Sequence, residues 1–482
     1  MSSVAHWNDA SFRIAEHYRM GWTTSQYLLL HLVGGGLSKI VGSTELACRI
    51  LLVGLAVAWV QSCRALLGAF HVDRRLAIMS APLFWNRALV VGFLPYVASL
   101  PLLFAVLALF VRVEVWTLSR AALLAVLGIL VFYTHASAFS LLAAITVALA
   151  VVRAWPRGGV ASRLVTVIVD CAWLAPASLF AGFWLVRGRF GSHASSIHDP
   201  SEIGTMNPIR AIKLIALYAH DTWTSHVDDW LGIGFWIVFL ALLAGSRRAP
   251  DDAKPGTLVP LVVAFVVYLL TPFRVGAGVF LNVRMAPVLA FFALLGLRPA
   301  RGLRGSLPLA IVPVLSLVQC IDNVHEIRVL QRDVEGLPEL LANVPRGARL
   351  VTLNFSGFDP FAAHFTPWVH VGSQHRASAG GVASFSFSEL THWSVQYRPE
   401  SAPPRQQDLS WGLHPCFFRN ERDGAYFDYV LARGAIDPFA TDPPGPRWRF
   451  VGRTEKYSLY EKDRAAQWIA ADGDRPDPGP CP

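Results

Sequence analysis

Long apolar segments, repeated from about residue 45 to Val318, constrain this chain more than any other feature. Of its 482 residues, 54% are hydrophobic and 16% are charged, whereas a soluble domain carries about 25% charged residues. A helix needs about 20 apolar residues to cross a bilayer. The sequence therefore predicts an α-helical polytopic membrane protein with about ten spans, followed by a water-soluble α/β domain.

The predicted spans are separated mostly by short polar loops. We expect them at residues 45–69, 76–86, 90–111, 120–134, 136–152, 163–186, 229–245, 257–271, 277–297 and 306–322. Two of the short segments, 76–86 and 136–152, are also compatible with half-spans. The segment 25–42 is apolar but interrupted by three glycines, and this pattern predicts a helix at the membrane interface.

Basic residues gather in alternate loops. The clusters are Arg64, Arg74 and Arg75; Arg112 and Arg120; Arg153, Arg157 and Arg163; Arg247, Arg248 and Lys254; and Arg298, Arg301 and Arg304. With the spans above, all five clusters fall on one side, which the positive-inside rule predicts to be cytoplasmic. Topology thus accounts for the formal charge of +9, and we expect no binding to nucleic acid.

The same topology predicts four regions. These are an extracytoplasmic N-terminal segment with the interfacial helix (1–44), a transmembrane domain (45–322), an extracytoplasmic α/β domain (323–470) and a disordered tail (471–482). Residues 325–344 read as an amphipathic helix that ends before Pro345. The segments ARLVTLNFS, YFDYVLARG, WRFVGRT and YSLYEK read as strands. Cys416 and Cys481 can form a disulfide if this side is oxidising.

Acidic and histidine side chains concentrate in the N-terminal segment. If residues 9–20 are helical, Asp9, Glu16 and His17 share one face. A carboxylate near the membrane surface can act as general base toward a sugar or lipid hydroxyl. The alternative is a solvated, charged leader that caps the first span.

The long loop 187–228 carries a second group of polar side chains. Its residues His220 and Asp221, with nearby acids, can hold a divalent metal such as Mg²⁺ or Mn²⁺. Its cations Arg187 and Arg189 can instead bind a pyrophosphate headgroup. A helix at the interface, with Trp and His at headgroup depth, explains the same residues without a ligand. We predict no other cofactor.

Two single side chains lie near the outer ends of predicted spans. His135 sits between two apolar helices, where an imidazole is costly unless it is paired or faces a water-filled cavity. Arg284 either extends to the interface or faces a cavity that holds an anion, and Arg suits phosphate by its bidentate geometry.

Several common catalytic motifs are missing from the sequence. There is no Walker A pattern, Gly-rich dinucleotide loop, Gly-x-Ser-x-Gly, His-Glu-x-x-His or Cys-x-x-Cys. The lack of these motifs argues against an ATP-driven pump, a Rossmann enzyme, a common serine hydrolase and a zinc protease.

The order of segments along the chain carries a resemblance. An acidic residue in WNDASFRIAEHY precedes the apolar helix TSQYLLLHLVGGGLSKIVG, then a span ending in a basic loop, then APLFWNRALVVGFLPYVASLPLLF and FYTHASAF. After many spans the chain ends with LPELLANVPRGARLVTL, YFDYVLARG and YSLYEK. This order resembles the multi-spanning glycosyltransferases of the GT-C superfamily, which use polyprenyl-phosphate-linked sugars, and most of all their uncharacterised bacterial branch.

The resemblance implies a site and a location. Such enzymes carry a catalytic Asp or Glu in the first extracytoplasmic loop, and Asp9, with Glu16 more weakly, matches that position. His135 and Arg284 match positions near the active cavity and are implied to bind the lipid phosphate. His17 is a further predicted substrate-binding residue, because it lies in the N-terminal cluster beside Glu16. The implied location is the bacterial inner membrane. The chain departs from the family in that only MSSVAHWN precedes Asp9, so we expect the first transmembrane helix to be lacking.

We therefore expect a membrane glycosyltransferase that moves a sugar from a polyprenyl-phosphate donor to an extracytoplasmic lipid, glycan or protein acceptor. The alternative is a non-catalytic GT-C-like protein that acts as a lipid or polymer transporter or as an envelope-assembly scaffold. Polyprenyl-phosphate-linked sugar and membrane lipids are the expected partners.

Overall fold

The protein was analysed as a computed structural model. The structure describes residues 1–21, 25, 27–156, 158–190, 204, 207–246, 254–275, 278–279, 281–300, 302–356, 367–384, 388, 393–403, 415–440 and 443–467. Its contacts divide the chain into two compact units. The helical unit comprises residues 25–30 and 50–324, and the mixed unit comprises residues 1–24, 31–49 and 325–482.

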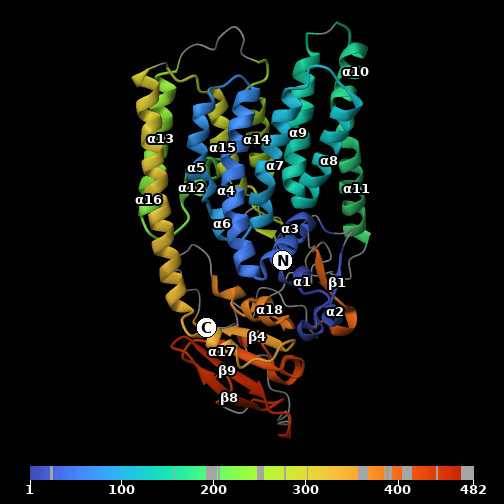
Figure 1. The fold of residues 1–482 in the computed structure, drawn as a ribbon, viewed down its shortest axis with the longest axis vertical. Coiled ribbons are helices and arrows are strands. Elements are labelled where there is room, and N and C mark those ends of the chain that lie inside the picture. Colours follow the sequence, from blue (N-terminus) through green and yellow to red (C-terminus); the bar gives the residue numbers. More distant parts are fainter. Residues whose placement is uncertain are drawn as a thin grey trace. The chain divides into compact units, whose positions relative to one another are not determined.

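Helices make up most of the helical unit (Figure 1). Three helices continue across the division of the chain: α3 (Leu28–Val41), α4 (Thr44–Ala69) and α16 (Leu303–Asp333). The others are α5 (Ala81–Phe84), α6 (Arg87–Val90), α7 (Leu94–Val111), α8 (Leu118–Thr134), α9 (Ala136–Ala154), α10 (Val160–Cys171), α11 (Ala175–Phe190), α12 (Pro208–His220), α13 (Val227–Ala244), α14 (Val259–Leu270) and α15 (Ala286–Ala293). Short 3₁₀ turns, η2 (Arg74–Ser80), η3 (Ala172–Leu174), η5 (Val283–Met285) and η6 (Leu294–Gly296), and a small hairpin of β2 (Arg274–Val275) and β3 (Gly278–Val279) join them.

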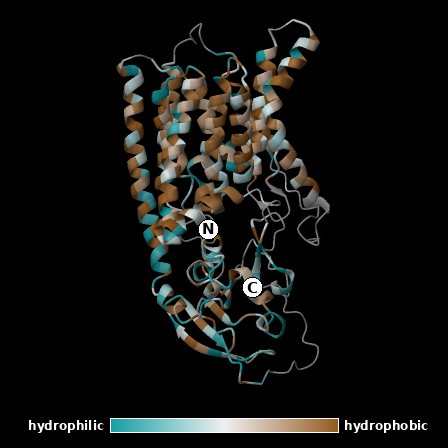
Figure 2. Ribbon diagram, turned by 45° about the vertical axis from the view of Figure 1, so that its right-hand side comes forward, coloured by the Kyte–Doolittle hydropathy of each residue, from teal (hydrophilic) through white to brown (hydrophobic). Residues whose placement is uncertain are grey.

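Six of these helical segments are long and apolar enough to cross a membrane, counted among the described residues. They are Thr44–Ala69, Leu94–Val111, Ala136–Ala154, Val160–Val186, Val227–Ala244 and Leu303–Asp333. Four shorter apolar helices accompany them: Leu28–Val41, Leu118–Thr134, Val259–Leu270 and Val283–Gly296. Figure 2 shows apolar residues along most of their length. A multi-pass membrane protein is therefore confirmed, while the total of about ten spans stays a prediction.

The predicted span at residues 76–86 is wrong as a continuous helix. The segment consists of η2 and the four-residue α5, and the chain leaves the helix at Trp85. Pro82 removes a backbone donor here. Irregular backbone is tolerated at membrane depth only inside protein, and Leu83 and Ser80 are indeed fully buried. The Trp59 indole N–H donates to the Ser80 carbonyl at 2.8 Å and so satisfies a buried backbone acceptor of this irregular segment.

The basic loops of the helical unit meet at one end. Arg112 donates to the Ala65 carbonyl (3.0 Å), Arg153 and Lys254 both donate to the Val111 carbonyl (3.0 and 3.2 Å), and the Arg298 amide donates to Ser246 (3.1 Å). These contacts join the loops that follow α4, α7, α9, α13 and η6. We call this the basic end. The described loops thus group as the alternating clusters predict, because helices that cross in succession return every second loop to the same end.

A five-stranded sheet forms the centre of the mixed unit (Figure 1). Its order is β5 (Val382–Ala383), β4 (Arg349–Asn354), β7 (Tyr429–Arg433), β9 (Tyr457–Lys462) and β8 (Trp448–Arg453). β4 pairs in parallel with β5 and β7, whereas β7–β9 and β9–β8 are antiparallel. The helical elements around it are α17 (Leu337–Leu341), α18 (Ser373–Ala379), and the short turns Pro367–His370, Pro399–Ser401, Pro415–Phe417 and Asn420–Gly424. The predicted α/β class and all four predicted strands are confirmed.

The N-terminal segment belongs to the mixed unit and is not one helix. It forms α1 (Ser2–Ala5), η1 (Ala10–Phe12), α2 (Ile14–His17) and β1 (Tyr18–Met20). β1 pairs antiparallel with β6 (Val395–Tyr397), and Phe12, Ile14 and Tyr18 join a core with Val351 and Val430. A helix over residues 9–20, on which a shared face of Asp9, Glu16 and His17 depends, is therefore not formed, because pairing of residues 18–20 with a distant strand overrides the local helical spacing.

The helix predicted over residues 325–344 is interrupted. Its first part is the end of α16, and the second part is α17, which starts after Gly336 at a φ of 72°. Only glycine adopts such a conformation without strain, so the helix stops there. Cys416 takes part in a disulfide, and its expected partner Cys481 lies outside the described residues, as does the tail 471–482.

Candidate functional site

His135 links α8 and α9 at the end of the helical unit away from the Arg112 loop. Its backbone is extended, so α8 ends and α9 begins at this residue. The imidazole Nδ1 accepts a hydrogen bond from the Ser137 amide at 3.2 Å and caps α9. An accepting Nδ1 carries no proton, so the neutral ring carries its proton on Nε2. The buried ring can therefore donate one further hydrogen bond.

Two tyrosines enclose the His135 ring. The ring centroids of Tyr27 and Tyr96 each lie 5.2 Å from that of His135, in edge-on geometry. Tyr96 is in the first turn of α7 and is 3% exposed. Its buried hydroxyl has no hydrogen-bond partner within the part of the chain that the structure describes. An unsatisfied buried hydroxyl costs free energy, so a ligand or water oxygen at this point would be stabilised.

Arg284 brings a positive charge to the same place. The guanidinium lies 3.4 Å from the centroid of the Phe93 ring. It acts electrostatically on Tyr27, Tyr96 and His135, which places the four groups in one cluster. We call Tyr27, Phe93, Tyr96, His135 and Arg284 the anion pocket.

Three helices begin at the anion pocket. Phe93 is the residue before α7, His135 precedes α9, and Arg284 lies two residues before α15. The first amides of a helix are unpaired and its N-terminus carries a partial positive charge. Among the described residues no side chain caps α7, whereas the helical run into α15 begins at η5, where the Asn282 side chain accepts from the Val283 amide. Together with the guanidinium and the histidine N–H, this arrangement attracts an anion with several oxygen acceptors.

A second arginine lines the space next to Arg284. This cavity shares Phe93 and Arg284 with the anion pocket and has about 250 Å³ of empty space, open solvent included. Its lining is Asn86, Arg87, Ala88, Val91, Phe93, Tyr218, Val283, Arg284 and Pro287. Arg87 donates to Oδ2 of Asp221 at 2.6 Å and lies 4.5 Å from the centroid of the Tyr218 ring. Asp221 thus holds Arg87 at the edge of this pocket, a role that the sequence pattern did not indicate.

Asp221, Asp228 and Asp229 form an acidic group that could hold a metal ion, with ligand atoms within 4.8 Å of one another. Several of its carboxylate oxygens already accept hydrogen bonds from protein groups. Asp228 accepts from the amides of Thr222 and Trp223 at 2.6 and 2.7 Å, and Asp221 pairs with Arg87. Mg²⁺ and Mn²⁺ prefer such oxygen ligands, so the donor set fits a divalent metal, which would share Asp221 with Arg87.

His220, also predicted in the 187–228 loop, is not among the residues that line the cavity beside Arg284. It is 3% exposed, its ring centroid lies 4.6 Å from that of Phe235 in a tilted arrangement, and it packs against Gly232 of α13. Such surroundings are those of a core histidine. The side chains of Arg187 and Arg189 lie outside the described residues.

Asp9 and Glu16 belong to the mixed unit, where Asp9 is half-buried and Glu16 is exposed. The Asp9 carboxylate caps η1 and accepts from the Ser11 hydroxyl at 2.7 Å and from its amide at 2.9 Å. These bonds hold the pKa of Asp9 below its ordinary value, so the carboxylate is ionised at neutral pH. Glu16 accepts from Arg13 at 2.8 Å. A cap and an ion pair explain both acids structurally, and a role as base stays a prediction.

His17 is buried at the end of α2. Neither ring nitrogen has a hydrogen-bond partner in the described part of the chain. Burial lowers the pKa of the imidazole, which is therefore neutral at pH 7. Its surroundings include Arg13, Glu16 and the Arg349–Asp428 ion pair.

We predict that the mixed unit loses stability in acid through a second buried histidine, His375. Burial lowers its pKa to about 4. The unfolded chain therefore binds the proton first, and stability falls as the pH drops from about 6.5 toward 4. Protonation linked to His375 alone should lower the free energy of unfolding by about 2 kcal/mol between pH 7.5 and 5, and His375→Gln should reduce the total loss measured by thermal unfolding by that amount. The exposed His325→Gln is the control; equal pH profiles for both variants would contradict the assignment.

The sequence pattern missed Tyr27, Phe93, Tyr96 and Arg87. Aromatic residues near span ends are common in membrane proteins, so they carried no specific signal. Arg87 carried no specific signal either, because a single cation in a loop between two spans is common in membrane proteins.

Comparison with known proteins finds one solved structure to report. Over 96% of this chain and 93% of that chain, the structure is similar to the crystal structure of ArnT from Cupriavidus metallidurans bound to undecaprenyl phosphate, with 11% sequence identity and a TM-score of 0.40. No family model and no curated protein matches the chain. An identity and a TM-score this low do not by themselves indicate a shared function.

Proposed function

We propose that the helical unit binds a lipid-linked phosphate in the anion pocket, and that the chain is a GT-C-like membrane glycosyltransferase. The observation that carries this proposal is the cluster of donors at Arg284, where a guanidinium and His135 meet the N-termini of α7 and α9. A phosphate offers several acceptor oxygens and matches such a donor set better than a neutral headgroup does.

The location of the pocket agrees with a lipid ligand. α7 and α9 are long and apolar enough to cross a membrane, so the pocket lies at the end of membrane-spanning helices. The phosphate of a polyprenyl phosphate resides at such a depth while its chain stays in the hydrocarbon. The basic end lies at the opposite end of α7 and supports an extracytoplasmic pocket in a bacterial inner membrane. The disulfide of Cys416 supports the same side for the mixed unit.

The proposed reaction moves a sugar from polyprenyl phosphate to a lipid, glycan or protein hydroxyl. Arg284 and His135 stabilise the negative charge that grows on the leaving phosphate. Asp9 is the proposed base, with Glu16 as second candidate, and His17, Arg187, Arg189, His220 and Asp221 remain predicted contributors to substrate binding. A divalent metal at Asp221, Asp228 and Asp229 would add charge stabilisation when bound.

The test is sugar transfer in membranes that contain the full chain, with a radiolabelled polyprenyl-phosphate sugar. We expect labelled product that depends on the protein and a tighter interaction with polyprenyl phosphate than with the phosphate-free polyprenol. Chelation with EDTA tests whether transfer requires a divalent metal. Loss of transfer and its rescue by Mg²⁺ or Mn²⁺ would support a metal requirement. Binding of the phosphate without any transfer would favour a non-catalytic lipid transporter or scaffold, and no preference for the phosphate would contradict the proposed site.

A further inference from the structure

The carboxyl ends of β4 and β7 lie next to each other in the mixed unit, because the two strands are parallel neighbours. The chain leaves β4 by way of α18 toward β5 on one side of the sheet, and it leaves β7 toward β8 and β9 on the other side. Open α/β sheets bind ligands at such a change of direction, outside the carboxyl ends of the strands. Arg433, the last residue of β7, stands opposite Asn354, the last residue of β4. Arg433 therefore occupies the place in this sheet where a ligand is expected.

The Arg433 side chain is a buried cation with incomplete hydrogen bonding. It is 3% exposed, and its Nη2 donates to Oδ2 of Asp333, at the end of α16, at 2.9 Å. Its Nε and Nη1 have no hydrogen-bond partner in the part of the chain that the structure describes. A guanidinium carries N–H donors on all three nitrogens, and a buried donor without a partner costs free energy. Arg433 can therefore donate to a further acceptor.

Two buried aromatic side chains add donors beside the Arg433 guanidinium. The Trp368 ring, from the turn η7 (Pro367–His370), has its centroid 4.8 Å from Cζ of Arg433. Tyr457 of β9 is paired in register with Arg433. Neither the Trp368 indole N–H nor the Tyr457 hydroxyl has a partner at hydrogen-bond geometry among the described residues. Burial raises the pKa of Tyr457 to about 12, against the opposing charge of Arg433, so the hydroxyl keeps its proton and can donate. We call Asp333, Trp368, Arg433 and Tyr457 the Arg433 site.

The composition of the Arg433 site indicates the chemistry of its ligand. Guanidinium and indole N–H groups only donate, so the ligand must offer acceptor oxygens, and the positive charge favours an anion. Asp333 already places one negative charge beside the guanidinium. A doubly charged phosphate would be repelled by this carboxylate more strongly than a singly charged group, because charges interact strongly where little water screens them. A carboxylate, with one charge and two oxygens, therefore fits the site better than a phosphate.

We propose that the Arg433 site binds the carboxylate group of a small ligand, with Arg433, Trp368 and Tyr457 donating to its oxygens. The site belongs entirely to the mixed unit and contains none of the residues of the anion pocket. It does not depend on the proposed glycosyl transfer, so either proposal can fail without the other.

The experiment measures the binding of three small probes to the full chain in a non-ionic detergent by saturation-transfer NMR titration. The probes are acetate, its neutral analogue acetamide, and methyl phosphate at pH 8, where this group carries two charges. Acetate should bind saturably and about tenfold more tightly than acetamide, because a hydrogen bond to a charged group is stronger than one to a neutral group. Methyl phosphate should bind more weakly than acetate.

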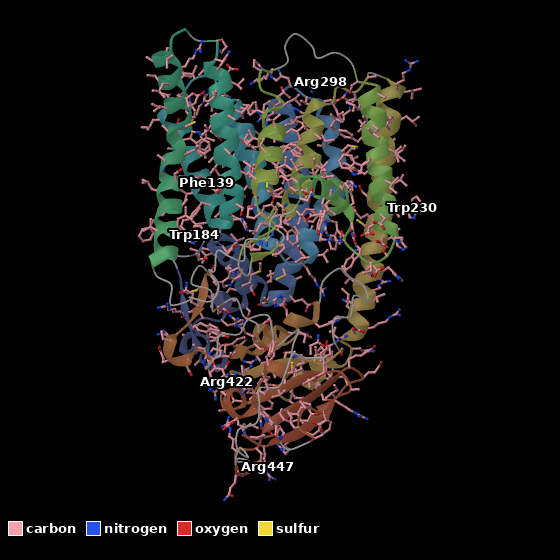
Figure 3. All side chains as sticks on the ribbon, turned by 180° about the vertical axis from the view of Figure 1, so that it is seen from behind. Phe139, Trp184, Trp230, Arg298, Arg422 and Arg447 are labelled. Atoms are coloured by element: carbon pink, nitrogen blue, oxygen red, sulfur yellow. The ribbon has the colours of Figure 1, made fainter. Side chains whose placement is uncertain are left out.

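Variants locate the binding of acetate within the fold. Arg433→Gln should abolish it, whereas Arg447→Gln should not change it. The exposed Arg447 (Figure 3) directly precedes β8 and marks the opposite edge of the sheet, where β7 begins. Asp333→Asn removes the competing charge and should strengthen the binding of both acetate and methyl phosphate several-fold.

Two milder variants keep the test valid if Arg433→Gln does not fold. Tyr457→Phe and Trp368→Phe each remove one donor but keep an aromatic ring and the cation, so each should weaken acetate binding about tenfold. Tyr429→Phe is the matched control, because the Tyr429 hydroxyl on the same sheet already donates to Glu461 at 2.7 Å.

Four results would overturn the proposal. These are no saturable binding of acetate by the wild type, equal affinities for acetate and acetamide, equal affinities of the Tyr457→Phe and Tyr429→Phe variants for acetate, and tighter binding of methyl phosphate than of acetate. The first three would leave Arg433 a structural cation of the sheet, and the last would assign the site to a phosphate instead.

Discussion

Replacing Arg284 by Gln is expected to weaken the binding of polyprenyl phosphate about a hundredfold. The guanidinium forms charge-assisted hydrogen bonds to a phosphate, each contributing about 1.5–3 kcal/mol. The pocket walls are aromatic, with Phe93 in contact with the guanidinium, so solvent screens this interaction little. Titration of purified full-length protein with polyprenyl phosphate measures the loss directly, and the affinity for the phosphate-free polyprenol should not change.

Two further variants make this result specific. Arg284→Lys keeps the charge but loses the planar fork, so its affinity should lie between those of the wild type and Arg284→Gln. Arg210→Gln removes an exposed charge from α12 and should bind as the wild type does. If the Arg284→Gln and Arg210→Gln variants bind polyprenyl phosphate equally, the anion pocket does not hold the phosphate.

Replacing Asp9 by Asn is expected to lower the rate of sugar transfer about a thousandfold without unfolding the protein. General base catalysis contributes about 10²–10⁴ in rate, and an amide cannot accept the proton. Asn is as good a helix cap as Asp. Its oxygen can still accept from the Ser11 amide and hydroxyl, so thermal stability should stay nearly constant. Transfer rates from membranes with equal amounts of protein report the role of Asp9 as a base, and unfolding temperatures report its role as a helix cap.

A matched control exists at a second 3₁₀ turn. Asp73 caps η2 by accepting from the Arg75 amide at 2.9 Å, as Asp9 caps η1. Asp73→Asn should leave transfer unchanged. Wild-type transfer by Asp9→Asn would show that Asp9 is a cap only, and Glu16→Gln in the same assay would then decide whether its neighbour is the base.

Apolar length and capping residues made most of the helical unit predictable. The predicted segments 90–111, 120–134 and 136–152 correspond to α7, α8 and α9, because a span long enough for the bilayer has few alternatives to helix. The segment 76–86 failed because Pro82 and burial permit irregular backbone there. In the mixed unit, β4 and β7 followed from their apolar runs, whereas β5 has two residues and no distinct pattern.

Part of the candidate site could be predicted from the sequence. His135 and Arg284 stand out in a sequence because a polar ring or a cation among apolar residues is costly and usually functional. Tyr27 and Phe93 do not stand out, since an aromatic residue near a span end has many roles. Only the folded chain brings Phe93 to 3.4 Å from the Arg284 guanidinium and both Tyr27 and Tyr96 to His135.

Local composition by itself therefore determined that this chain crosses a membrane, where its basic loops group and that its last third forms an α/β domain. These properties depend on solvent transfer and on short-range periodicity, which each segment carries alone. Tertiary structure decided that residues 18–20 form a strand with residues 395–397 and that the N-termini of α7 and α9 meet near Arg284. Contacts between residues far apart in sequence depend on the packing of the whole unit, and no local pattern encodes them.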